Sequence, residues 1–212
     1  EGKALVRVSP GTGWDSFAPW CVRRGWSGVE NLSLIPGNAG SGPIQNIGAY
    51  GAEIAEVIRE VSFISMESGR SEVLQKEDCR FGYRDSVFKR ELAGKVIITG
   101  VLFELQTGPP ALHLDYGSIR QELAGMGIRN PGLADVREAV IRIRRSKLPD
   151  PEVLGNAGSF FKNPVVPEVK AQELISANPT MPSWPDPRGK KIPAAWLIEQ
   201  CGWKGKRAGQ AG

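Results

Sequence analysis

Residues 35–51 (IPGNAGSGPIQNIGAYG) have the composition of a ligand-binding loop. They hold five glycines and two prolines, and no charged residue lies between Glu30 and Glu53. Glycine lets a backbone approach a ligand closely, and proline fixes φ and removes an N–H donor. Such a loop is rigid and irregular, and its remaining N–H groups can face a phosphate or a flat polar ring. The alternative is a buried loop that only packs.

Two further segments combine glycine with side chains that can act on a ligand. Residues 81–86 (FGYRDS) carry Arg84, and residues 155–164 (GNAGSFFKNP) carry Ser159 and Lys162. A serine has too high a pKa to donate a proton unless its neighbours polarise it, and Lys162 and Arg84 are candidates for that task. The alternatives are a surface ion pair of Arg84 with the aspartate that follows it, which stabilises little, and an inert turn at the serine.

Composition argues against several kinds of site. The three cysteines form no C-x-x-C pair, so the sequence indicates neither a disulfide framework nor a zinc site, and a reducing cytoplasm fits this pattern. The only histidine, His113, lacks a G-x-S-x-G segment and is expected in a strand or loop. The net charge of +4 comes without a basic block, which favours a pocket for an anionic small molecule over nucleic acid. No apolar run reaches membrane-spanning length.

Hydrophobic periodicity predicts the elements that position these segments. Strands are expected over residues 4–8, 57–66, 71–74 and 95–105. Helices are expected over residues 14–24, 134–147, 167–177 and 193–201, and a proline-rich loop over residues 179–188. Strands and helices mix without a βαβ rhythm, so the sequence predicts an α+β fold. The segment LPDP at residues 148–151 has the composition of a domain boundary.

Taken in order, the three segments resemble those of the UDP-N-acetylenolpyruvylglucosamine reductases, flavoenzymes that complete UDP-N-acetylmuramate for bacterial cell-wall synthesis. The resemblance runs from about Val6 to about Gly205. It implies that NADPH reduces FAD, that hydride passes to an enolpyruvyl ether, and that a side chain supplies the proton. It also implies a cytoplasmic, monomeric enzyme that acts on a UDP-sugar and binds neither nucleic acid, membrane nor metal.

The resemblance assigns roles to single residues. Arg84 is implied to bind the substrate carboxylate as charge develops on it, and Ser159 to donate the proton. The residues implied along the flavin are Ile35, Pro36, Gly37, Ser41, Ile44, Gly48, Ala49 and Ile98. The residues implied at the substrate are Tyr50, Tyr116, Lys147, Asn163 and Trp184. Trp184 stands where tyrosine is common, which keeps an aromatic face and loses a phenol O–H. Lys147 has an alternative role as a helix C-terminal cation.

The chain departs from the family pattern at both ends. No glycine-rich flavin-pyrophosphate loop precedes Glu1, and the family's catalytic glutamate would lie beyond Gly212. An internal fragment, itself inactive, is therefore expected, with residues 1–149 as the FAD-binding domain and residues 150–212 as the start of the substrate domain. Two alternatives stay open: a non-catalytic nucleotide-sugar-binding fragment, and an FAD oxidoreductase of the same scaffold with another substrate. The presence of Ser159 and Arg84 favours catalysis.

Overall fold

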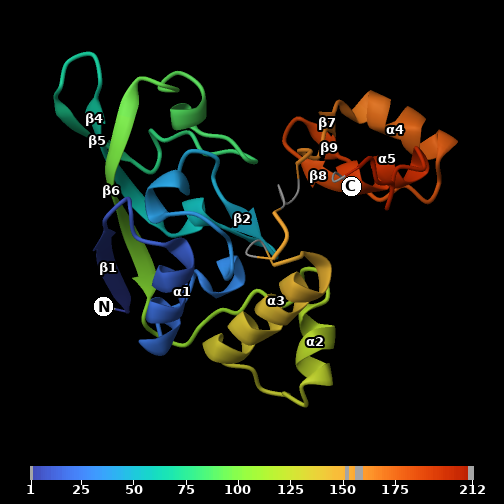
Figure 1. Ribbon diagram of the computed structural model, residues 1–212, viewed down its shortest axis with the longest axis horizontal. Helices are drawn as coiled ribbons and strands as arrows, with labels where there is room; N and C mark the ends of the chain where they lie inside the picture. The colour runs from blue at the N-terminus through green and yellow to red at the C-terminus, as the bar shows by residue number, and fades with distance from the viewer. Residues whose placement is uncertain (1, 151–152, 156–159, 210–212) are drawn as a thin grey trace. The chain divides into compact units, whose positions relative to one another are not determined.

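The computed structural model describes residues 2–150, 153–155 and 160–209, and the chain divides into two compact units, Glu1–Gly155 and Asn156–Gly212 (Figure 1). Each unit has its own antiparallel sheet together with helices. This mixture confirms the predicted α+β class. Within the described residues, none of the helices combines the length and the apolar composition needed to cross a membrane.

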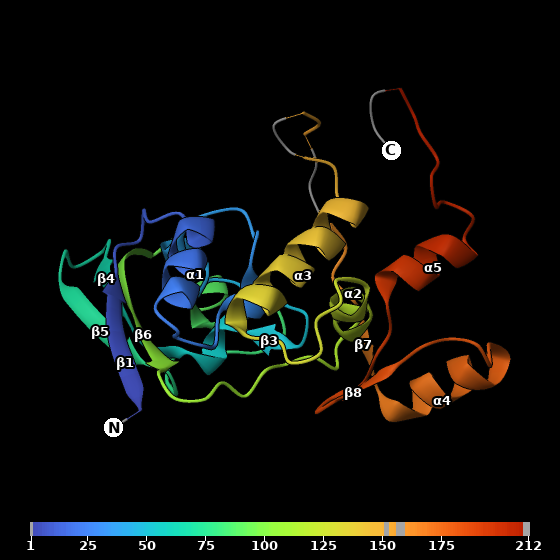
Figure 2. The same cartoon turned by 90° about the horizontal axis from the view of Figure 1, so that it is seen from below.

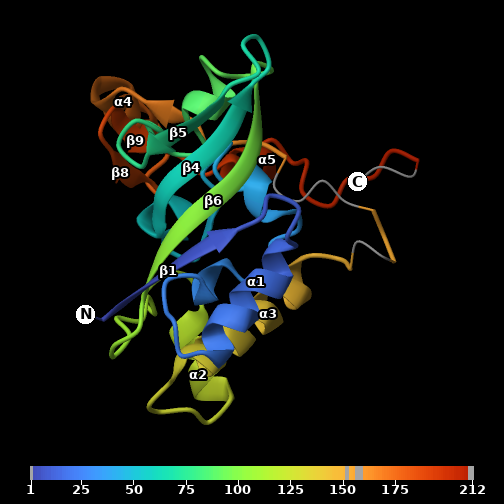
Figure 3. The same ribbon diagram turned by 90° about the vertical axis from the view of Figure 1, so that its left-hand side faces the viewer.

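A four-stranded sheet with the order β1-β6-β4-β5 forms the frame of the first unit (Figure 3). Its strands are β1 (Lys3–Val8), β4 (Ile58–Ser65), β5 (Ser71–Gln75) and β6 (Val96–Gln106). Alternate residues of β6, namely Val101, Phe103 and Leu105, are fully buried, as expected where one face of a strand meets the core. The four predicted strands are confirmed, with no end shifted by more than one residue.

Helix α1 (Trp14–Arg23) packs against one face of this sheet (Figure 2). The rings of Trp14 and Phe17 lie 6.0 and 5.0 Å from the ring of Phe103, centre to centre. The helix ends before Gly25, whose φ of +71° suits a residue without a Cβ. The predicted helix over residues 14–24 is confirmed, and it holds the start of the glycine- and proline-rich loop against the sheet: Trp14 N donates to Gly37 O at 2.9 Å.

The loop itself is irregular, as predicted, and contains only two very short elements among its described residues, η2 (Ala39–Ser41) and β2 (Gly48–Ala49). Short elements also flank it, namely η1 (Glu30–Leu32), β3 (Ala52–Glu53) and η3 (Ile54–Glu56). Strands β2 and β3 form a hairpin whose two turn residues, Tyr50 and Gly51, have φ of +50° and +82°. Positive φ at both central residues is the pattern of a type I′ turn, whose twist matches that of paired strands.

Helices α2 (Ile119–Gly125) and α3 (Leu133–Lys147) form a second, small core of the first unit. This core consists of Ile119, Leu123, Ala139, Val140 and Ile143, and Tyr50 packs against it. The predicted helix over residues 134–147 is confirmed. Helix α2 was not predicted, because seven residues give only two apolar positions of the helical repeat.

The second unit contains a three-stranded sheet of order β7-β9-β8 and two helices. Its elements are β7 (Val165–Val166), α4 (Glu168–Ala177), β8 (Trp184–Asp186), β9 (Gly189–Lys191) and α5 (Ala194–Gln200). The helices expected over residues 167–177 and 193–201 are confirmed. The loop expected over residues 179–188 is partly wrong, because Trp184–Asp186 forms β8. Pro185 is compatible with that strand because β8 is at the edge of the sheet, where one missing N–H is tolerated.

Candidate functional site

A hollow of about 630 Å³ lies between the glycine- and proline-rich loop and the segment that leads into β6. The loop contributes Gly37, Gly40, Ser41 and Ile44, among others, and β6 contributes Ile98. Four of the eight residues predicted along a flavin therefore line one hollow: Gly37, Ser41, Ile44 and Ile98. The other four, Ile35, Pro36, Gly48 and Ala49, lie outside its lining. Ile35 and Ala49 pack against the main core instead.

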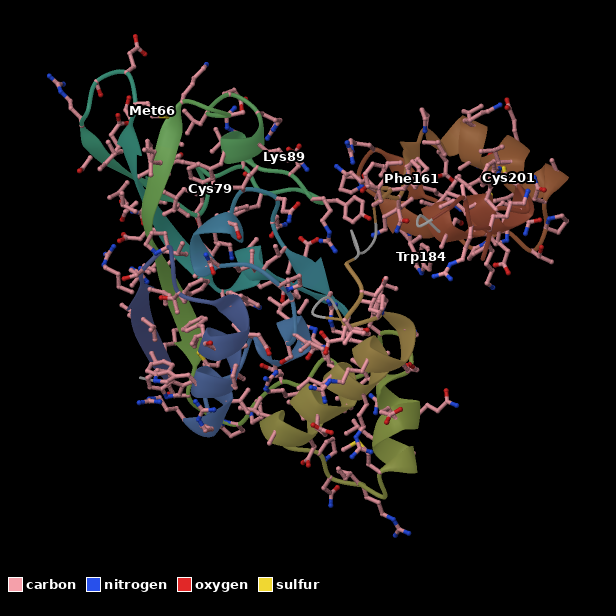
Figure 4. All side chains as sticks on the ribbon, in the orientation of Figure 1. Met66, Cys79, Lys89, Phe161, Trp184 and Cys201 are labelled. Atoms are coloured by element: carbon pink, nitrogen blue, oxygen red, sulfur yellow. The ribbon has the colours of Figure 1, made fainter. Side chains whose placement is uncertain are left out.

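The lining of the hollow suits a flat ring with an anionic substituent. Apolar side chains such as Phe88 and Leu92 alternate with glycine backbone, and Lys89 contributes a positive charge (Figure 4). Gly40 allows close packing here, because a Cβ on it would lie 2.5 Å from Pro10 Cβ. Flavin dinucleotides combine an apolar ring system with a diphosphate, so the residues present are compatible with FAD.

Arg84 is fixed to the same loop. It lies in a tight turn closed by two backbone hydrogen bonds between Gly82 and Asp85, of 3.0 and 3.1 Å. Its guanidinium donates to the carbonyl oxygens of Asn46, at 3.3 Å, and of Gly48. The surface pair of Arg84 with Asp85 is thus wrong, because the Asp85 carboxylate lies 3.4 Å from Arg90 Nε instead.

A second attachment joins the two segments. The buried Ser86 hydroxyl donates to Ile44 O at 2.7 Å and accepts from Phe88 N at 3.2 Å, at the start of η4 (Val87–Lys89). Lys89 Nζ in turn donates to Arg84 O at 3.1 Å. The residues that line the hollow and the residue that carries the candidate carboxylate-binding group therefore belong to one hydrogen-bonded assembly.

Tyr50 and Tyr116 lie together beside that assembly. A Cβ on Gly51 would be 3.1 Å from Tyr116 Cβ, so the hairpin tip and Tyr116 are in contact. Burial raises the pKa of Tyr50, whereas the positive charge of Arg144 opposes that rise and Tyr116 adds to it. Asn31 Nδ2 donates to the carbonyl oxygens of Tyr50 and His113, both at 2.8 Å. His113 lies in a loop, as predicted, and its backbone anchors the hairpin.

Lys147 is the last residue of α3 and is exposed. Tyr50 packs against the small core that includes Val140 and Ile143 of α3. Arg144 and Lys147 follow these residues in the last turn of that helix. Phenols and cations are group types that suit a diphosphate. The same position also fits the alternative in which Lys147 interacts with the helix dipole.

The other predicted residues belong to the second unit. Ser159 lies outside the described residues. Asn163 Oδ1 accepts from Ala194 N at 2.8 Å, so this side chain caps the start of α5. Trp184 begins β8 with 42% of its surface exposed, and Phe161 is 62% exposed (Figure 4). Aromatic side chains of this unit are thus exposed.

Other titratable groups of the described residues offer less to catalysis. Burial raises the pKa of Cys21 and of Cys79 to about 12, so both thiols stay protonated at neutral pH and behave as core residues. Within the part of the chain that the structure describes, no cluster of three or more histidine, cysteine or acidic side chains could hold a metal ion.

Sequence reasoning missed Asn46 and Glu53. Asn46 is fully buried and donates to Glu53 Oε2 at 2.7 Å and to Gly82 O at 3.0 Å. Glu53 Oε1 also lies 3.8 Å from Arg84 Nη1. The available signal was that Glu53 is the first charged residue after the charge-free stretch, but its partners come from segments that sequence alone does not bring together.

Family models match both parts of the chain. Residues 1–74 match a model described as FAD binding domain, and residues 150–212 match the C-terminal domain of UDP-N-acetylenolpyruvoylglucosamine reductase. A solved structure of UDP-N-acetylenolpyruvylglucosamine reductase from Thermus caldophilus is similar with a TM-score of 0.62 and 24% identity, over 96% of this chain and 56% of that chain. At this identity the similarity shows the fold.

Curated relatives are much more similar in sequence. The chain is 49% identical over 210 residues to UDP-N-acetylenolpyruvoylglucosamine reductase of Chromobacterium violaceum, covering 98% of this chain and 61% of the relative. It is 50% identical over 214 residues to the protein of the same name from Xanthomonas axonopodis pv. citri, covering 99% of this chain and 60% of the relative. The chain therefore spans about three fifths of the length of these relatives.

Proposed function

Since the chain is homologous over nearly all its residues to the UDP-N-acetylenolpyruvoylglucosamine reductases, we propose that the protein containing it reduces UDP-N-acetylglucosamine enolpyruvate to UDP-N-acetylmuramate in peptidoglycan precursor synthesis. The observation that carries this proposal is the attachment of Arg84 to the loop that lines the hollow. That attachment sets a carboxylate-binding group beside a site compatible with FAD.

The FAD site of this proposal is the hollow and its loop. Gly37, Ser41, Ile44 and Ile98 would contact the cofactor directly, and Lys89 adds a cation at the rim. Ile35, Pro36, Gly48 and Ala49 would support the loop from behind. When bound, FAD supplies the hydride that it has received from NADPH. The apolar lining would exclude water from the reacting carbon and strengthen every charge interaction there.

Side chains of this protein would then stabilise the charge on the substrate carboxylate and donate the proton to the substrate carbon. Arg84 would bind the enolpyruvyl carboxylate through its guanidinium and stabilise the negative charge that grows on it. Ser159 would donate the proton to the neighbouring carbon, with Lys162 or Arg84 lowering the cost of leaving an alkoxide. Tyr50 would border the substrate. Tyr116, Lys147 and Asn163 would hold its diphosphate and sugar, and Trp184 would cover the nucleotide.

In this proposal residues 1–149 form the FAD-binding domain and residues 150–212 the start of the substrate domain. The match of residues 150–212 to a C-terminal-domain model supports the division. We further propose a monomeric, cytoplasmic enzyme that binds no nucleic acid. The mostly apolar lining of the hollow, with Lys89 at its rim, supports binding of a small ligand and not of a nucleic acid.

The purified full-length protein should test the function directly. We expect it to be yellow, to lose its flavin absorbance near 450 nm on anaerobic addition of about one equivalent of NADPH, and to regain it when UDP-N-acetylglucosamine enolpyruvate is added. A colourless protein that binds the nucleotide sugar would instead support the non-catalytic alternative. Flavin that NADPH bleaches and the enolpyruvyl substrate does not reoxidise would indicate another substrate.

Loss of the diphosphate contacts should weaken binding more than chemistry. In the full-length protein, Lys147→Ala and Tyr116→Phe are each expected to raise KM for the nucleotide sugar about tenfold and to change kcat by no more than about twofold. This is the result when a lost contact stabilised the bound substrate and the transition state equally. Steady-state kinetics measures this, with Arg145→Ala on the same helix end as the control. A fall in kcat with unchanged KM would place these residues in the chemical step.

A further inference from the structure

We propose that Asn46 and Glu53 are positioning residues that hold the Arg84 guanidinium in the orientation that receives a substrate carboxylate. This inference rests on the proposed function, in which Arg84 binds that carboxylate. Asn46 comes from the glycine- and proline-rich loop, Glu53 from β3 and Arg84 from the turn over residues 82–85. Hydrogen bonds join Asn46 to Glu53 and to Arg84, and an ion pair joins Glu53 to Arg84.

Asn46 is the centre of the set. Its Nδ2 donates to Glu53 Oε2 and Gly82 O, and its Oδ1 accepts from Ala55 N at 3.1 Å. Its own carbonyl accepts from Arg84 Nη1. One fully buried amide side chain therefore joins the acid, the turn that carries Arg84 and the start of η3. Buried polar groups with all partners in place are rigid, because breaking any one bond leaves a desolvated group unpaired.

Glu53 supplies the charge in this set. Oε2 accepts from Asn46, and Oε1 faces Arg84 Nη1 at 3.8 Å. The carboxylate also accepts from the backbone N–H of Glu56 in η3. The side chains of Arg84 and Glu53 are 33% and 38% exposed, so solvent screens the pair and its net contribution to stability is small. Its effect is one of direction, because a carboxylate held from behind by an amide attracts the guanidinium to one side.

The N–H groups of Arg84 divide into those that anchor the guanidinium and those that would bind the substrate. Nη1 interacts with Asn46 O and Glu53, and Nη2 donates to Gly48 O. A guanidinium has five N–H donors, and its Nε–H lies on the same edge as one N–H of Nη2. Among the residues that the structure describes, the Nε–H of Arg84 has no hydrogen-bond partner. Two parallel N–H groups on one edge match a carboxylate bidentately. The anchoring contacts involve one edge of the guanidinium, and the substrate carboxylate would bind to the other edge.

The backbone at this place is strained in a way that supports a functional arrangement. Asn46, Tyr50 and Arg84 have φ of +44°, +50° and +53°, and together they make up three of the five non-glycine residues with positive φ in the described residues. Such conformations persist only where the surrounding contacts impose them, and they concentrate at functional sites. Here the Asn46 contacts and the turn bonds between Gly82 and Asp85 impose them at Asn46 and Arg84, and the hairpin turn between β2 and β3 imposes it at Tyr50.

Gly48 shows how little room the arrangement has. A Cβ on Gly48 would lie 2.7 Å from Arg84 Nη1, 3.0 Å from Ala52 O and 3.0 Å from Glu53 Cγ. Gly48 is one of the residues predicted along the flavin, yet its immediate neighbours are the positioning contacts. We infer that a glycine is needed at residue 48 to let the guanidinium reach the loop backbone.

A double-mutant cycle in the full-length protein tests the proposal. We expect Glu53→Gln, which keeps the acceptor for Asn46 and removes the charge, to slow flavin reoxidation by the enolpyruvyl substrate about ten- to a hundredfold, because small misplacements of a reacting group cost that much. In an Arg84→Lys background the same substitution should slow reoxidation by less than a further factor of about two, because the effects of substitutions at residues that act through one another are not additive. Glu60→Gln, which removes the carboxylate that pairs with Arg7 on the sheet, is the matched control.

Binding gives a second measurement, independent of turnover. The dissociation constant of the enolpyruvyl substrate, followed by the change in flavin absorbance, should rise in Glu53→Gln, while that of UDP-N-acetylglucosamine, which lacks the carboxylate, should not. Asn46→Gly, which keeps positive φ accessible, and Gly48→Ala should behave in the same way. Melting temperatures identify any variant whose loss is one of folding.

Different outcomes would contradict the role of Arg84 and the role of Glu53. If Arg84→Lys leaves reoxidation unchanged, the proposed role of Arg84 is wrong. If Arg84→Lys is slow but Glu53→Gln is as fast as the parent, or if the two effects multiply in the double variant, Glu53 does not act through Arg84 and the present inference is overturned.

Discussion

Replacing Ser159 by alanine in the full-length protein should leave flavin reduction by NADPH unchanged and slow reoxidation by the enolpyruvyl substrate about 10²–10⁴-fold, the usual contribution of a general acid. The physical reason is that NADPH delivers its hydride without needing a proton at the substrate. Hydride addition to the enolpyruvyl carbon, by contrast, leaves its neighbour carbanion-like until a proton arrives. Stopped-flow absorbance separates these two half-reactions.

Two controls make the Ser159→Ala result specific. Ser176→Ala alters an exposed hydroxyl on α4 of the same unit and should match the parent in both half-reactions. A solvent isotope effect on reoxidation should be normal in the parent if proton transfer contributes to that step. A Ser159→Ala variant that reoxidises at the parent rate would remove this serine from the mechanism.

Replacing Arg84 by lysine should slow reoxidation about 10²–10³-fold, comparable to the loss of one donor from a site that stabilises developing negative charge. Arg84 contacts Asn46 O, Gly48 O and Glu53 at the same time, and a single ammonium cannot span these groups and still offer two parallel donors. The rate of flavin reduction and the flavin content of the purified protein show whether the cofactor site is intact.

The matched control for this variant is Arg142→Lys. Arg142 pairs with Glu138 at 2.8 Å on the exposed side of α3, where an ammonium can replace a guanidinium with little loss. We expect that variant to keep the parent rates. Equal kcat and KM in Arg84→Lys and the parent would mean that Arg84 acts only as a structural residue of its turn.

The sequence by itself determined most of the elements and the irregular loop that lines the hollow. Strand β6 and helix α3 follow from hydrophobic periods of two and 3.6 residues, and the burial of Val101 and Phe103 on one and of Val136 and Val140 on the other agrees with those periods. The irregular loop was predictable because glycine and proline act on the local backbone, whatever lies around them. Gly37, Ser41, Ile44 and Ile98, which line one hollow, were among the predicted residues.

Local patterns misled where neighbours decide the conformation. Residues 184–186 have the composition of a loop, yet pairing with β9 makes them a strand, since an edge position tolerates proline. Asn163 was expected only at the substrate, and in the folded unit its amide oxygen caps α5, 31 residues away in the sequence.

Only the tertiary structure decided what holds Arg84. The carbonyl groups that accept from its guanidinium lie 38 and 36 positions earlier in the chain, and sequence proximity had pointed to the adjacent Asp85 instead. Asn46 and Glu53 are equally invisible to sequence reasoning, because a buried asparagine and a half-exposed glutamate acquire their meaning from the groups that face them. Periodicity and turn chemistry are local properties, whereas hydrogen bonds between distant segments exist only after the chain has folded.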